Sequence, residues 1–330
     1  MIDWVFGRIC PPERLPLSPT RRDLLKQMGL FAGASPLLGR ALQNAAAGPS
    51  MSFPVKARDR LAVTSWPFRE YIDSPANHRR NPATPGMDLK EFPAMVVEKF
   101  DVYNINPLID HFRSTDPAYL ASFREAVAKA GSHVVDLGSR GGQFYSPESQ
   151  TRASAVESGR KWIDIAVLVG SPSVRQHVSG KRGEKPQVDV AAQSLGEVAE
   201  YGAKHNIVVN LENDNPVAED PFFLVAVIEK VNSPYLRALP DFGNSLPAHD
   251  AAYNERAVKA MLQHAYNMCH VKDTVESDSG KTSTVDLAKM FELARSASYP
   301  GFFSMEFDTN AGDPFAGTTR LIKESLKYLE

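Results

Sequence analysis

The sequence predicts an α/β fold, a single (β/α)8 barrel (TIM barrel) preceded by a signal peptide, and three observations support this class. Short β-rich runs alternate with amphipathic stretches over residues 55–330, as a parallel sheet with crossover helices requires. The starts of successive β-rich runs lie 29–41 residues apart, which leaves room for one β/α unit each. The 283 residues that follow residue 47 fit one barrel, which takes roughly 250 residues.

Eight runs are candidate strands because each is short, rich in β-branched or apolar residues, and bounded by turn residues. They are Leu61–Ser65, Val102–Asn106, His133–Leu137, Ser173–His177, Ile207–Glu212, Leu236–Asp241, Asn267–Lys272 and Gly301–Glu306. The fourth is the least determined, since Ile163–Val169 also has the composition of a strand and would shift the count. A doubly wound open sheet is the competing architecture, but no Gly-x-Gly-x-x-Gly turn follows any candidate strand.

Amphipathic stretches between the strands predict the helices. They are Asp116–Ala130, Ala191–His205, Pro221–Val231, Tyr253–His264 and Val285–Ser296. Two long polar segments, Tyr71–Met87 and Ser139–Ala153, are expected to be loops that follow strands. Loops of this kind form the catalytic face of a (β/α)8 barrel.

Residues 1–47 have the pattern of an export signal. A charged run, Thr20-Arg-Arg-Asp-Leu-Leu-Lys26, precedes a modestly apolar stretch and then the small residues Ala45–Ala47. The charged run resembles the motif of a twin-arginine signal. The apolar stretch falls short of the roughly 20 residues that span a bilayer as a helix, so no membrane span is expected. We therefore expect cleavage after Ala47 and a periplasmic or otherwise exported protein.

The composition argues against several classes of function. The formal net charge is −2, the pI is about 6.5 and the chain has no basic stripe, so nucleic acid is not an expected partner. Of the two cysteines, Cys10 lies in the signal segment, which leaves Cys269 without a disulfide partner in the mature chain. The sequence leaves a homo-oligomer open.

Four successive candidate strands each carry, at or near the C-terminal end, a residue that can bind a metal: Glu212, Asp241, His270 and Glu306. The C-terminal ends of barrel strands converge on one mouth, so three carboxylates and one imidazole are expected to surround one point. Crowded carboxylates repel one another, and a divalent cation removes this repulsion. We therefore predict one divalent metal ion; the mixed ligands suit Mn²⁺, Mg²⁺, Co²⁺ or Zn²⁺ without choosing among them.

The four strand ends also carry a family resemblance. They read Leu211-Glu-Asn213, Asp241-Phe-Gly-Asn244, His270-Val-Lys-Asp273 and Ser304-Met-Glu-Phe-Asp308. These segments resemble the xylose isomerase-like barrel superfamily of sugar isomerases, sugar epimerases and dehydratases, over residues 58–330. The resemblance implies that Glu212, Asp241, His270 and Glu306 bind one divalent metal. In the epimerase branch the two glutamates also exchange protons with the substrate, so the resemblance assigns Glu212 and Glu306 as acid/base residues.

Five further residues are candidates for the site. Lys272 shares a strand face with His270, so it either stabilises an oxyanion or pairs with a ligand carboxylate. Trp66, Asn106, His177 and Asn244 follow or end strands and are candidate substrate contacts, each with an ordinary structural role as the alternative. DNA-repair endonucleases of the superfamily carry a histidine where this chain has Asn244. With the acidic pI, this departure disfavours that activity.

The leading hypothesis is a sugar isomerase or epimerase that removes a proton beside a carbonyl, with the metal stabilising the enediolate. The alternative is a lyase or dehydratase that uses the same site on a keto-sugar or a 3-keto-glycoside. A third hypothesis is a barrel that binds sugar without turning it over. The expected partner in every case is a small sugar or sugar-like polyol.

Overall fold

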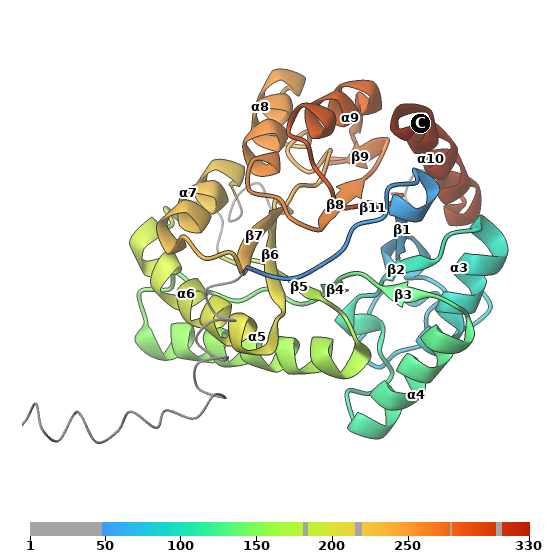
Figure 1. Cartoon of the computed structure of the whole chain (residues 1–330), viewed down its shortest axis with the longest axis horizontal. Helices are drawn as coiled ribbons and strands as arrows, with labels where there is room; N and C mark the ends of the chain where they lie inside the picture. The colour runs from blue at the N-terminus through green and yellow to red at the C-terminus, as the bar shows by residue number, and fades with distance from the viewer. Residues whose placement is uncertain (1–47, 181–183, 215–219, 278, 308–311) are drawn as a thin grey trace, which may run out of the picture. The chain divides into compact units, whose positions relative to one another are not determined.

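The computed structural model describes residues 48–180, 184–214, 220–277, 279–307 and 312–330. From Gly48 onward these residues belong to one compact unit, in which helices surround a ring of strands (Figure 1). The predicted signal segment, residues 1–47, lies outside the described residues. No helix in the described ranges is long and apolar enough to cross a bilayer.

The strands of the ring are parallel to their neighbours. They are β1 (Leu61–Thr64), β2 (Asn104–Asn106), β3 (His133–Val134), β4 (Leu137–Gly138), β5 (Ser173–Gln176), β6 (Val208–Glu212), β7 (Leu236–Leu239), β8 (Met268–Val271) and β11 (Phe302–Met305). They pair in the orders β3-β2-β1-β11-β8 and β4-β5-β6-β7. Bridges between Leu108 and Gly138 and between Asp241 and His270 join the two sets. The sheet therefore closes into a barrel, as predicted, and is not an open doubly wound sheet.

The third strand of the barrel is interrupted. The sequence predicts one strand over His133–Leu137, whereas the structure has β3 and β4 with Val135 and Asp136 between them. β3 pairs with β2 and β4 pairs with β5, so the two pieces together occupy one position in the ring. The barrel thus has eight strand positions.

The helices form the outer layer of the barrel (Figure 1). They are α3 (Phe92–Phe100), α4 (Pro117–Lys129), α5 (Ser149–Val169), α6 (Val188–His205), α7 (Pro221–Val231), α8 (Ala251–Leu262), α9 (Leu287–Ser296) and α10 (Pro314–Leu329). Residues 163–169 form the last turns of α5, so the alternative strand is wrong and β5 is the fourth strand of the barrel. The predicted loop over 139–153 ends early, at the start of α5, because Ala155, Val156 and Ile163 bury one face of this otherwise polar helix.

Side chains alternate between the inside of the barrel and the helix layer. In β6, Val209 and Leu211 join the large apolar core beneath the helices, so Asn210 and Glu212 point the other way. A smaller cluster closes the N-terminal end of the interior. We call this cluster the apolar floor; it consists of Ala62, Val135, Leu239, Met268 and Phe302.

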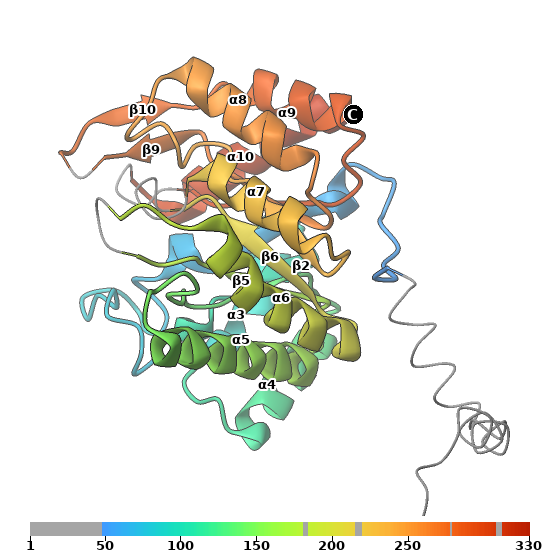
Figure 2. The same ribbon diagram turned by 90° about the vertical axis from the view of Figure 1, so that its left-hand side faces the viewer.

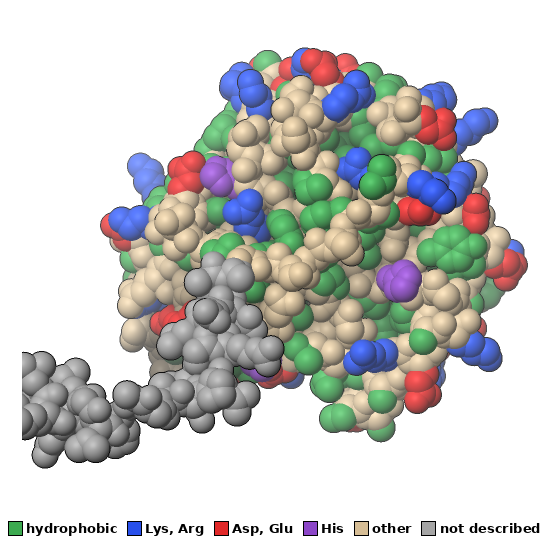
Figure 3. Space-filling model, viewed as in Figure 1, with side chains coloured by type: hydrophobic (Ala, Val, Ile, Leu, Met, Phe, Trp, Pro, Cys, Tyr) green, Lys and Arg blue, Asp and Glu red, His purple; other side chains and the backbone are tan. Residues whose placement is uncertain are grey.

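The first described residues cover the apolar floor from outside. Met51 and Phe53 pack against it, and the ring of Phe53 lies 5.4 Å from that of Tyr266 in an edge-on contact. The hydroxyl of Tyr266 donates a hydrogen bond to the carbonyl of Pro49 at 2.7 Å. Figure 3 views this face, with hydrophobic side chains among those at its centre. The N-terminal end of the barrel is therefore closed, and access to the interior is from the other end.

Loops and a hairpin extend from the C-terminal end of the barrel. The hairpin consists of β9 (Thr274–Glu276) and β10 (Thr282–Thr284), which are antiparallel and follow β8. Figure 2 shows it at the end opposite residues 48–57. The loop predicted over Tyr71–Met87 also follows a barrel strand, and a bridge between Ile72 and Met87 ties its two ends together.

Candidate metal centre and cavity

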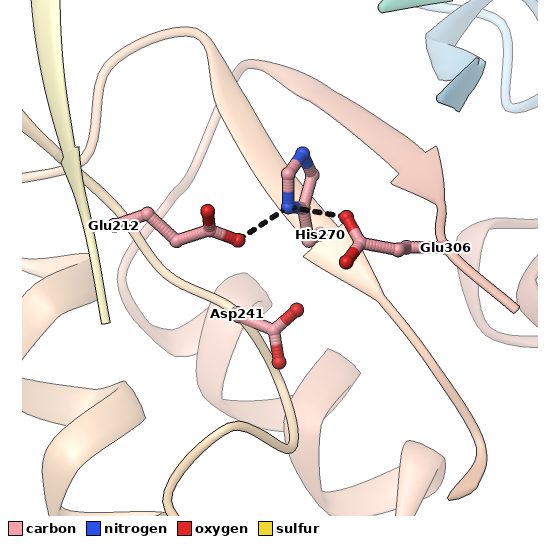
Figure 4. Close-up of side chains that lie close together, drawn as sticks. All are labelled: Glu212, Asp241, His270 and Glu306. Carbon is pink, nitrogen blue, oxygen red and sulfur yellow. Dashed lines mark hydrogen bonds and ion pairs between the residues drawn. The ribbon is translucent and has the colours of Figure 1, made fainter. Parts of the chain in front are cut away.

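The inward positions at the C-terminal ends of four neighbouring strands carry the four predicted ligands. Glu212 ends β6, His270 lies in β8, and Glu306 follows β11 directly. Leu239, the last residue of β7, points into the barrel. Asp241 lies two residues further on, so its side chain also points inward. Figure 4 shows the four side chains converging on one point.

The ligand atoms of these four residues all lie within 4.8 Å of one another, and all four side chains are buried. His270 Nδ1 is 2.6 Å from Glu212 Oε1 and 2.8 Å from Glu306 Oε2 (Figure 4). One nitrogen carries at most one proton, so it cannot donate to both carboxylates. Asp241 Oδ2 and Glu306 Oε2 are buried beside charged neighbours, and neither has a well-oriented hydrogen-bond donor. A divalent cation at this point would satisfy all four groups, so the residues present fit one.

A local turn aims the Asp241 carboxylate. Its Oδ1 accepts the backbone N–H groups of Gly243 and Asn244 at 2.8 and 2.9 Å, which leaves Oδ2 for the cluster. Gly243 is needed because a Cβ there would lie 2.8 Å from Val285 and 3.2 Å from the Lys272 side chain. The short Asp-Phe-Gly-Asn segment therefore has a geometric reason for its composition.

Two cations balance the carboxylates from the cavity side. Arg175 Nη1 lies 2.7 Å from Glu212 Oε2. Lys272 Nζ lies 3.1 Å from Asp241 Oδ2 and 3.3 Å from Glu306 Oε1, and it donates to Asn244 Oδ1 at 2.9 Å. Lys272 thus makes the ion pair that was one of its two predicted roles, and it also lines the cavity.

These charges shift the pKa values of the cluster in opposite directions. Burial alone would raise the pKa of Glu212, but Arg175 and His270 outweigh burial and hold it at about 2. Burial would lower the pKa of His270, yet the two adjacent glutamates raise it to about 10. Burial raises the pKa of Asp241 to about 6, against the pull of Lys272. Without a metal, His270 is therefore a cation at neutral pH.

A cavity of about 420 Å³ opens above the cluster. Its lining residues are Trp66, Leu108, Ile109, Asp110, Gly138, Ser139, Arg140, Gly141, Arg175, His177, Ser179, Asp214, Lys272 and Glu306. Among the predicted contacts, Trp66 and His177 thus face this space. The Arg69 guanidinium lies 4.3 Å from the centre of the Trp66 ring and steadies it. His177 lies 3.5 Å from Glu212 Oε2 and 3.6 Å from Asp214 Oδ2.

Two of the predicted substrate contacts, Asn106 and Asn244, hydrogen-bond to other protein side chains. Asn106 has no exposed surface, and its Oδ1 lies 2.9 Å from His270 Nε2, on the side away from the carboxylates. Asn244 is almost fully buried, and its Oδ1 is taken by Lys272. Neither is among the residues that line the cavity above the cluster.

Sequence reasoning missed Arg175, although a signal for it is present. Arg175 lies in the middle of the fourth strand, two residues before His177, so both side chains share the inward face. A charged residue at an inward strand position requires a partner of opposite charge. The partner, Glu212, could not be identified without the pairing of β5 and β6.

The chain belongs to the family described as "Xylose isomerase-like TIM barrel", which matches residues 95–330. Solved structures with the same fold include a protein of that description from Mycobacterium smegmatis in complex with magnesium. It is 16% identical, covers 86% of this chain and 97% of its own, and has a TM-score of 0.60. An L-ribulose 3-epimerase is 17% identical over 82% of this chain and 95% of its own, with a TM-score of 0.62.

A third similar structure is a D-allulose 3-epimerase from Methylomonas sp. in complex with D-allulose. It is 16% identical over 85% of this chain and 98% of its own, with a TM-score of 0.60. At these identities the likeness is one of fold. A comparison with curated proteins finds no match.

Proposed function

We propose that this protein is a divalent-metal-dependent isomerase or epimerase of a sugar or sugar-like polyol. The observation that carries the proposal is the buried set Glu212, Asp241, His270 and Glu306, whose ligand atoms lie within 4.8 Å of one another beneath an open cavity. Family membership supports it, as do the sugar epimerases and the magnesium complex among proteins of the same fold.

The bound metal would act as a Lewis acid that stabilises negative charge on the oxygens of a keto-sugar as a proton leaves the neighbouring carbon. Asp241 and His270 serve as ligands. Glu306 lines the cavity, so its carboxylate is placed to take or return that proton. Glu212 is the second acid/base candidate, and its Oε2 lies next to Arg175 and His177 on the cavity wall. Lys272 supplies a positive charge beside Glu306.

The cavity walls suit a polyhydroxylated substrate. Trp66 offers a flat aromatic surface for the apolar face of a sugar ring. Arg140, His177, Ser179 and Asp214 offer donors and acceptors for hydroxyl groups. Asn106 and Asn244 are not part of this proposal, because neither lines the cavity and the Oδ1 of each contacts a protein side chain.

The test combines metal analysis with product analysis. We expect the purified mature protein to carry about one divalent metal per chain, and to convert a keto-sugar into a product of equal mass when ketoses and 3-keto-glycosides are screened by mass spectrometry. A product of lower mass would assign the lyase reaction instead. If the protein bound sugar but did not convert it with any of the metals supplied, it would be a sugar-binding protein and not an enzyme.

Metal binding is expected to release about one proton. His270 has a pKa of about 10 and is protonated at neutral pH, whereas a metal ligand must present a lone pair. The apparent metal affinity should therefore rise roughly tenfold per pH unit between pH 6.5 and 8.5. Below pH 6 the apparent metal affinity should depend on pH more steeply, because Asp241 is then also protonated in the metal-free protein. Calorimetric titration of the metal-free protein in buffers of different ionisation enthalpy measures the proton count. A heat of binding that is the same in every buffer would contradict the prediction.

We also propose that residues 1–47 are a twin-arginine signal and that the enzyme works outside the cytoplasm. The motif at Thr20–Lys26 supports this. The strands and helices of the barrel that the structure describes all follow Gly48, so cleavage after Ala47 would remove none of them. The N-terminal sequence of the protein recovered from the periplasm tests it. Arg21→Lys with Arg22→Lys should retain the protein in the cytoplasm.

A further inference from the structure

A layer of polar side chains fills the barrel interior near the metal centre. We call it the polar layer; it consists of Asn106, Asp136, Ser173, Asn210 and Asn267, none of which has exposed surface. The middle of a (β/α)8 barrel is normally filled by branched apolar residues. Burying polar groups costs free energy unless each is hydrogen-bonded, so a polar layer in this place calls for a reason.

The polar layer touches the metal centre at one contact, between Asn106 and His270. Asn106 Oδ1 lies 2.9 Å from His270 Nε2, the ring nitrogen that faces away from the carboxylates. On its other side, Asn106 Nδ2 lies 3.0 Å from the backbone carbonyl of Asp136 and 3.2 Å from the carboxylate of the same residue. Asn106 is thus a two-sided link between the polar layer and the histidine.

The orientation of the Asn106 amide follows from its partners. A backbone carbonyl only accepts hydrogen bonds, so the NH₂ group of Asn106 must face Asp136 whatever the protonation state of that carboxyl group. The amide oxygen must then face His270. An amide oxygen only accepts, so His270 Nε2 must carry a hydrogen and donate it. In the neutral ring, the lone pair therefore lies on Nδ1, the nitrogen within 2.8 Å of both glutamates.

The remaining members of the polar layer hold Asp136 in place. Asn210 donates to Asp136 Oδ1 at 3.0 Å and to Asn267 Oδ1 at 3.0 Å. Asn267 donates in turn to the Val135 carbonyl and to Ser173 at 3.0 and 2.7 Å. The interruption between β3 and β4 falls at Val135 and Asp136, and the Asp136 carbonyl accepts a hydrogen bond from the Asn106 amide.

We propose that Asn106 is a positioning residue that fixes the tautomer and ring orientation of His270, so that Nδ1 is the metal-binding nitrogen. The inference rests on the proposed metal centre. Asn106 touches neither the substrate cavity nor the carboxylate ligands; it acts through His270 alone. Partners of this kind on the far nitrogen of a metal-bound histidine typically change metal affinity by about 10–100-fold.

A matched pair of variants on β2 tests the proposal. Asn106→Leu keeps the approximate shape but removes the acceptor for His270. Asn104→Leu changes the same residue type two positions earlier; Asn104 is also buried and donates to the carbonyls of Asp59 and Leu61 at 2.8 Å each, without touching His270. The readout is the Kd for Co²⁺, from titration of the metal-free protein followed by visible absorption. We expect Asn106→Leu to raise this Kd about 10–100-fold and Asn104→Leu to leave it unchanged.

A second measurement needs no variant. In the Zn²⁺-loaded wild-type protein with ¹⁵N-labelled histidine, nuclear magnetic resonance should show a hydrogen on Nε2 of His270 and the metal on Nδ1. Metal on Nε2, or equal Kd values for Asn106→Leu and the wild type, would overturn the inference while leaving the metal centre intact. A wild-type protein that binds neither Co²⁺ nor Zn²⁺ would remove the metal centre itself, and the inference with it.

Discussion

Replacing Glu306 with Gln is expected to lower kcat by about 10²–10⁴-fold, the usual contribution of a positioned acid/base group. Gln has nearly the same shape, but its amide cannot take a proton from the substrate. Glu306 is the one carboxylate of the cluster that lines the cavity. The assay should use saturating metal, because the loss of a charged ligand also weakens metal binding.

The control is the same chemical change at the rim of the same cavity. Asp110 lines the cavity and pairs with Arg140, but both side chains are partly exposed and lie outside the cluster. Asp110→Asn should therefore lower kcat far less than Glu306→Gln. If kcat fell equally in the two variants, the loss would come from the reduced negative charge of the cavity and not from a missing proton transfer at Glu306. An active Glu306→Gln would refute its catalytic role outright.

The clustering of the four candidate ligands was predictable because it depends on two regularities that a sequence carries. Parallel strands of a barrel end at one mouth, and side chains alternate along each strand. Given candidate strands of the right spacing, the inward residues at the ends of four of them are Glu212, Asp241, His270 and Glu306. The same alternation predicted that Lys272 and His270 face the same way, and both contact carboxylates of the cluster.

The partners of the cluster were not predictable, because each depends on contacts across the ring. Asn106 was predicted to touch substrate; its contact with His270 joins β2 to β8 across the barrel interior, and no local pattern in the sequence indicates that contact. Arg175 meets Glu212 only because β5 pairs with β6 in one particular register. The break between β3 and β4 lies at Asp136, which hydrogen-bonds to Ser173 and Asn210 on other strands, and the local pattern of His133–Leu137 does not indicate these contacts.

Replacing Arg175 with Met is expected to destabilise the metal-free protein by about 3–5 kcal/mol at pH 7, the typical cost of breaking a buried ion pair. Arg175 and Glu212 are almost fully buried, and Nη1 lies 2.7 Å from Oε2. Met fills much of the space but leaves the Glu212 carboxylate without its main cation. The measurement is urea unfolding of the metal-free protein. Arg160→Met is the control, because Arg160 pairs with Glu197 at the surface and such pairs contribute at most about 1 kcal/mol.

The pH dependence separates this effect from a loss of packing. Burial alone would raise the pKa of Glu212, but Arg175 and His270 depress it to about 2, below the roughly 4.3 of an unfolded glutamate. A depressed carboxylate stabilises the fold above the unfolded pKa, and this stability is lost as pH falls toward the folded pKa. The difference between the wild type and Arg175→Met should therefore be full at pH 7 and shrink as pH falls toward about 2, the folded pKa of Glu212 in the wild type. If the difference in free energy of unfolding did not change with pH, Arg175 would stabilise the barrel by packing alone and not by its charge interaction with Glu212.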